Sequence, residues 1–95
     1  MHEAALCEGV LAVALDAARG EPVTRVRVRV GEVQAVVRES FEFCWKLVAD
    51  GTTAADSAVE LHMVRGDVLE VEEVEVQGGD VRRNPRFATL HEEGG

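Results

Sequence analysis

The chain has 95 residues, which is enough for one domain with a single modest core. Its net charge is −8, so its surface would repel a phosphate backbone, which argues against a nucleic-acid partner. No apolar run approaches the ~20 residues that span a membrane, and Glu3, Glu8 and Asp16 interrupt any apolar leader segment. Residence in the cytosol is therefore expected.

Residues 3–18 are predicted to form the first helix. Apolar residues recur there at helical spacing, with two more that widen the stripe: Leu6, Val10, Val13 and Ala17, then Leu11 and Ala14. Gly20 is expected to end this helix, and Pro22 prevents its continuation.

The next stretch, "VTRVRVRVGEV", alternates strictly and predicts a half-buried strand that ends at Gly31. Its valines form one face and its arginines the other: Val26, Val28 and Val30 against Arg25, Arg27 and Arg29. An arginine stripe can bind anions. The favoured interpretation is a solvated sheet face on which the arginines pair with acidic residues of neighbouring strands, namely Glu60, Glu70, Glu72 and Glu75.

The segment "ESFEFCWKLVADG" predicts the second helix, which Ser40 or Glu39 would start and Gly51 would follow. Its expected core face consists of Phe41, Cys44, Trp45 and Val48, extended by Leu47. The segments "VELHMV" and "VLEVEEVEV" then predict two strands joined by a hairpin turn at "RGD". The alternation slips at Glu72–Glu73, which indicates a bulge or bend.

This order of elements predicts an α+β domain over residues 1–77, with a small mixed three-stranded sheet and both helices on one face. Residues 78–95 have no periodicity and many turn-forming residues, so they are interpreted as a flexible tail. The tail contains "RRNPR", which could contact an acidic partner, and His91, whose acidic neighbours resemble a weak metal site. A solvated segment is the simpler interpretation of both.

Cys7 and Cys44 lie far apart in the sequence and belong to no metal-binding spacing motif. In a reducing compartment the simplest interpretation is two buried thiols. A disulfide between them, or a shared site for a soft metal, is the alternative.

The first three residues, Met1-His2-Glu3, could chelate a divalent metal. The α-amine of Met1 and the amide nitrogen of His2 would close a five-membered ring around the ion, and that amide with the His2 imidazole would close a six-membered ring. Glu3 would complete the set through its amide nitrogen or its carboxylate. Nitrogen-rich tetragonal sites suit Ni(II) and Cu(II) rather than Zn(II) or Mg(II).

Four stretches carry a resemblance to the HypA/HybF family, the nickel metallochaperones of [NiFe]-hydrogenase maturation. They are "MHE..LCEGVL", "V..VRVRVGEV", "ESFEFCW.LVADGT.A" and "LEVEEVEV", and together they extend over residues 1–77. The resemblance implies that Met1, His2 and Glu3 form the nickel site. It also implies two partners, the hydrogenase large-subunit precursor and the maturation GTPase HypB.

The chain departs from the family pattern at two places. The family's zinc module, with two CxxC pairs, has no counterpart here, because the sequence contains no CxxC and "MVRGDVL" stands where the module would begin. No structural zinc is therefore expected, unless a separate chain supplies that module. Where family members often have an acidic residue, this chain has Val37, and Glu39 is a candidate substitute.

Two functions follow from these features. The first is a nickel carrier that uses the N-terminal tip, and the alternative is a metal-free adaptor that docks on hydrogenase maturation partners. An enzyme is not expected, because the sequence contains no Ser/His/Asp or Cys/His constellation and no phosphate-binding loop.

Overall fold

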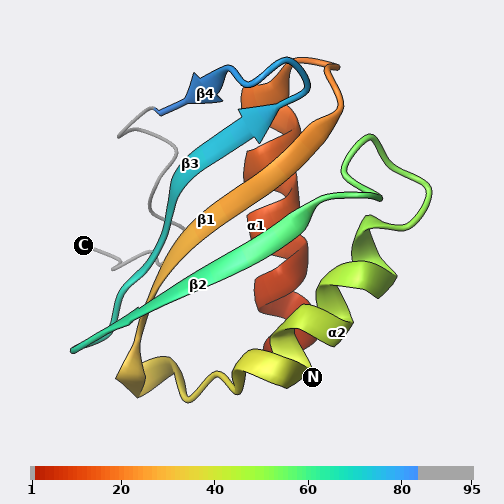
Figure 1. The fold of residues 1–95 in the computed structure, drawn as a ribbon. Coiled ribbons are helices and arrows are strands. Elements are labelled where there is room, and N and C mark those ends of the chain that lie inside the picture. The colour runs from red at the N-terminus through yellow and green to blue at the C-terminus, as the bar shows by residue number, and fades with distance from the viewer. Residues whose placement is uncertain (1, 84–95) are drawn as a thin grey trace.

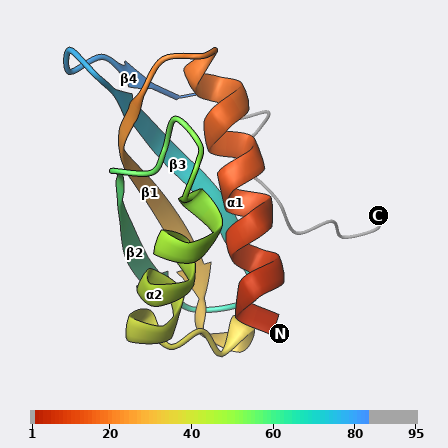
Figure 2. The same ribbon diagram turned by 90° about the vertical axis from the view of Figure 1, so that its right-hand side faces the viewer.

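The computed structural model describes residues 2–83 as two helices that cover one face of a twisted sheet (Figures 1 and 2). The helices are α1, His2–Ala18, and α2, Arg38–Ala49, and a short 3-10 turn, η1, spans Glu32–Gln34. The strands are β1, Val23–Gly31; β2, Ala58–Val64; β3, Leu69–Val76; and β4, Val81–Arg82. The α+β class and the placement of both helices on one face are confirmed.

The sheet is mixed, with strand order β2-β1-β3-β4 among the described residues. β1 runs parallel to β2 and antiparallel to β3. The expected hairpin between β2 and β3 is therefore wrong, because β1 lies between these two strands. Residues 65–68 instead carry the chain across the end of β1, where the Gly31 N–H donates to the Val68 carbonyl at 2.7 Å and the Val33 N–H donates to the Gly66 carbonyl at 3.0 Å.

The face of the sheet opposite the helices carries the expected ladder of arginines and glutamates. Arg25 lies 3.5 Å from Glu60 of β2 and 3.2 Å from Glu75 of β3, and Arg29 lies 3.2 Å from Glu70. The side chains of Arg25, Arg27 and Arg29 are 39%, 47% and 40% exposed. Each of their ion pairs therefore contributes only a few tenths of a kcal/mol to stability. The ladder accounts for the arginine stripe without a bound anion.

The slip in β3 is a bulge, as expected. Arg27 pairs with Glu73 and Val28 with Val71, so Glu72 is the extra residue on β3. The shift keeps valines on the helix side of the sheet on both sides of the bulge, since Val71, Val74 and Val76 are all fully buried.

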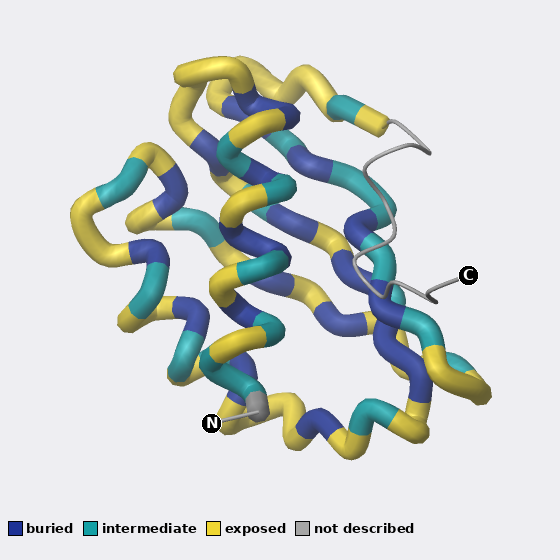
Figure 3. The backbone as a smooth tube through the Cα atoms, turned by 180° about the vertical axis from the view of Figure 1, so that it is seen from behind, coloured by how far each residue is buried: buried dark blue, intermediate teal, exposed yellow. Residues whose placement is uncertain are grey.

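The core lies between the sheet and the helices and is built mainly from valine and alanine (Figure 3). Phe41 and Trp45 of α2 are its largest fully buried side chains, and the Trp45 indole N–H donates to the Ser57 hydroxyl at 2.9 Å. Cys44 and Val48 are partly buried against this core. The inclusion of Leu47 in the core face is wrong, because Leu47 is 62% exposed.

A fourth strand, β4, was not expected. Gly78 and Gly79 adopt positive φ values of 97° and 94°, which reverse the chain after β3, and β4 then pairs antiparallel with β3. The Arg82 guanidinium donates to the Ala17 carbonyl at the end of α1 at 2.9 Å. The rest of the expected tail, with His91, lies outside the described residues. Within residues 2–83, neither helix has the length and apolar character needed to cross a membrane.

Candidate metal site

The candidate metal site is the N-terminal end of α1, which lies beside the start of α2 (Figures 1 and 2). Met1 lies outside the described residues, His2 is the first residue of α1, and Glu3 is the acidic residue of its first turn. The first four N–H groups of a helix have no acceptor within the helix. The amide nitrogens of His2 and Glu3 can therefore change their bonding without breaking a helical hydrogen bond.

The Glu3 carboxylate joins this tip to α2. Its Oε2 accepts a hydrogen bond from the Val37 N–H at 2.8 Å. Val37 is the N-cap residue of α2 and provides no side-chain cap of its own. Glu3 therefore supplies the cap from another helix, and its negative charge lies where the dipole of α2 favours an anion.

This contact was missed by sequence reasoning. The one hint in the sequence is the position of Val37, where the family resemblance leads us to expect an acidic residue. Here the backbone N–H of that residue, rather than its side chain, faces the Glu3 carboxylate. Glu39, the candidate substitute, is exposed in the first turn of α2, and its role in binding nickel stays a prediction.

Replacing Glu3 by alanine is expected to destabilise the fold by about 1 kcal/mol, the usual cost of removing a helix N-cap. The Val37 N–H would lose its acceptor, whereas the main chain of residue 3 would keep its amide nitrogen. Urea denaturation followed by circular dichroism measures this change. Glu3→Gln should lose less stability than Glu3→Ala, because the glutamine amide oxygen can still accept the hydrogen bond from the Val37 N–H.

Glu8→Ala is the matched control, because it removes an exposed carboxylate from the same helix and leaves the Glu3–Val37 hydrogen bond in place. Its unfolding midpoint should stay close to that of the parent chain. An equal loss of stability in Glu3→Ala and Glu8→Ala would show that charge on α1, rather than the cap, stabilises the fold.

Other potential ligand groups are dispersed. Among the side chains that the structure describes, no three His, Cys, Asp or Glu residues gather as a metal site. His62 lies on the charged face of the sheet, with its Nδ1 3.8 Å from Glu72. The two cysteines are both free thiols. Burial, followed by the proximity of Cys44, raises the pKa of the Cys7 thiol to about 12.

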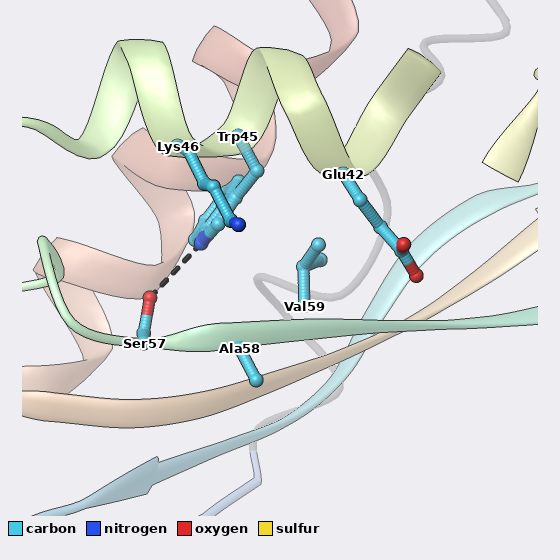
Figure 4. A pocket seen from close by; sticks show the side chains of 6 residues that line it. All are labelled: Glu42, Trp45, Lys46, Ser57, Ala58 and Val59. Atoms are coloured by element: carbon cyan, nitrogen blue, oxygen red, sulfur yellow. Dashed lines mark hydrogen bonds between the residues drawn. The ribbon is translucent and has the colours of Figure 1, made fainter. Parts of the chain in front are cut away.

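A groove of about 280 Å³ runs between α2 and β2 (Figure 4). Glu42, Trp45 and Lys46 of α2 line one wall, and Ser57, Ala58 and Val59 line the other. The Trp45–Ser57 hydrogen bond joins the two walls, so the indole nitrogen is already satisfied. Among the described residues, Glu3 does not line this groove.

Comparison with known proteins identifies a family over most of the chain. Residues 1–69 match the family described as hydrogenase/urease nickel incorporation, metallochaperone, HypA. The match starts at the tip and ends at the first residue of β3. It therefore covers both helices, β1, β2 and the connection that crosses the end of β1.

Curated relatives named hydrogenase maturation factor HypA agree with this match. The chain is 38% identical to the protein of Dechloromonas aromatica and 39% identical to that of Rhodopseudomonas palustris, each over 69 residues that cover 70% of this chain and 61% of the relative. It is 34% identical to the Archaeoglobus fulgidus protein over 71 residues, covering 72% of this chain and 64% of the relative. The chain thus spans about three fifths of the length of these relatives. It belongs to the HypA family of nickel-incorporation metallochaperones.

Proposed function

We propose that this chain binds Ni(II) at Met1, His2 and Glu3 and delivers it for [NiFe]-hydrogenase maturation. The family description supports the choice of metal and pathway. The observation that carries the proposal is the start of α1 at His2, because a chelating tip needs main-chain nitrogens that are free of helical hydrogen bonds.

The proposed donors are the Met1 amine, the amide nitrogens of His2 and Glu3, and the His2 imidazole. A set of four nitrogens suits Ni(II), which favours nitrogen-rich tetragonal sites. Loss of the amide protons would offset the positive charge of the ion, which a helix N-terminus otherwise disfavours. The Glu3 carboxylate already accepts the Val37 N–H, so we assign to Glu3 an amide ligand rather than a carboxylate ligand.

The hydrogenase large-subunit precursor and the GTPase HypB are the proposed recipient and partner, and the cytoplasm is the proposed compartment. In this role the chain carries a metal and catalyses no reaction. The link between β2 and β3 consists of residues 65–68, and the proposal places nickel at the N-terminal tip.

Nickel binding is expected to weaken by at least about 50-fold between pH 7.5 and pH 6.0. The metal binds deprotonated nitrogens, and an α-amine with a pKa near ~7.8 and an imidazole with a pKa near ~6.5 both take up protons over this range. Calorimetric titration of the untagged chain at the two pH values measures the change, and one site is expected at pH 7.5. An affinity that does not change with pH would contradict a nitrogen chelate and point to carboxylate ligands.

A further inference from the structure

The two cysteines lie together at the contact between α1 and α2. The Cys7 thiol is fully buried and donates to the Phe41 carbonyl at 3.5 Å. Phe41 precedes Cys44 by three residues on α2, so it lies about one helical turn away on the same side of that helix. Cys44 also contributes to the raised pKa of the Cys7 thiol. Tertiary packing thus brings two thiols that are 37 positions apart in sequence close together at the contact between the helices.

The two thiols differ in their access to solvent. Cys44 is partly buried, whereas Cys7 has no exposed surface. Burial, Cys44, Glu3 and Glu8 all disfavour a thiolate at Cys7. Because the thiolate is the reactive form, Cys44 is the sulfur that an oxidant reaches first. The same asymmetry argues against a shared metal site, since both cysteines would have to bind as thiolates.

We propose that Cys44 and Cys7 are a redox modification site, at which hydrogen peroxide converts the two thiols into an intramolecular disulfide. The Cys44 thiolate attacks one peroxide oxygen, the O–O bond breaks, and the departing hydroxide leaves as water with the proton that Cys44 lost. Cys44 is then a sulfenic acid. The Cys7 sulfur attacks the Cys44 sulfur, the S–O bond breaks, and the oxygen leaves as water with the Cys7 proton. Two thiols lose two electrons, and peroxide is reduced to two waters.

The first step prepares the second, because the sulfenic acid of Cys44 supplies the electrophilic sulfur that Cys7 attacks. The disulfide would tie α1 to α2 about one turn beyond Glu3 on α1 and about two turns beyond Val37 on α2. This inference does not depend on nickel binding.

The test treats the fully reduced chain with hydrogen peroxide, blocks the remaining thiols, and determines the mass and the linked peptides without reduction. The expected product is a monomer that has lost two hydrogens, has no free thiol, and contains a peptide pair joining Cys7 to Cys44. Dithiothreitol should restore both thiols. A disulfide between two copies, or Cys44 oxidised to sulfinic acid beside a free Cys7, would overturn the proposal.

Two variants test the order of the steps. In Cys7→Ala, dimedone should trap a sulfenic acid at Cys44, because the resolving thiol is absent. In Cys44→Ala, the buried Cys7 should react at least about tenfold more slowly than Cys44 does in Cys7→Ala. Equal reaction rates of the two single cysteines would contradict the assigned roles. If a variant fails to fold, the peptide map of the parent chain alone decides the proposal.

Discussion

An extension of four residues, Gly-Ser-Gly-Ser, before Met1 is expected to abolish nickel binding near neutral pH. The extension turns the Met1 amine into a peptide nitrogen and moves the free amine too far from the His2 imidazole for the two to share adjoining five- and six-membered rings. His2→Ala removes the imidazole and should have a similar effect. Loss of outer-shell partners costs roughly 10–100-fold in metal affinity, and loss of a direct ligand should exceed that range.

His62→Ala is the matched control for these variants. It removes an exposed imidazole from β2, on the charged face of the sheet, and leaves the tip intact. Calorimetry on the four proteins should show one nickel site in the parent chain and in His62→Ala, and none in the extended chain or in His2→Ala. Unchanged binding in the extended chain would refute the proposed site.

The same variants separate a nickel carrier from a metal-free adaptor. The extension changes no residue of the described fold, so an adaptor that only docks on maturation partners should keep its activity. A carrier should lose it. Hydrogenase activity in a strain that lacks this gene, complemented with each form, distinguishes the two. Full rescue by the extended chain would favour the adaptor.

Local periodicity was sufficient to predict most of the elements. The alternation of valine and arginine before Gly31 predicts β1, its buried face and its acidic neighbours, because each follows from a period of two within one strand. The bulge at Glu72 was predicted for the same reason. Pairing order is a property of distant segments. The "RGD" turn therefore suggested a hairpin, although β1 separates β2 from β3.

The features that the sequence did not predict, at the candidate metal site and at the edge of the sheet, arise from tertiary contacts. The Glu3–Val37 hydrogen bond joins two helices across 34 positions, and no local pattern encodes it. Strand β4 has two residues, which is too short for a periodicity, and it is held in part by Arg82 at the end of α1. Leu47 was misplaced because an apolar residue beside a buried stripe has the same local pattern whether it is buried or exposed.

Gly31→Ala is expected to lower the free energy of unfolding by roughly 3–5 kcal/mol. A Cβ on Gly31 would overlap the Gly66 carbonyl and lie 2.6 Å from the Val68 nitrogen. Both neighbours are backbone, so no side-chain rotation can relieve the overlap. The connection between β2 and β3 would have to move away from β1, which breaks the Gly31–Val68 and Val33–Gly66 hydrogen bonds. Such a loss is a large fraction of the ~5–15 kcal/mol that stabilises a typical domain.

Gly66→Ala is the matched control because it changes the other glycine of the same contact. Its added Cβ would meet nothing within 4 Å, and its cost arises from a φ of +95°. That strain amounts to about 1–2 kcal/mol. Urea denaturation of both variants should therefore show the larger loss in Gly31→Ala. The prediction is contradicted if the two losses of stability are equal or if Gly66→Ala is the less stable variant. Either result would mean that residues 65–68 can move away from the end of β1 at little cost, so their close packing there would not stabilise the arrangement of the strands.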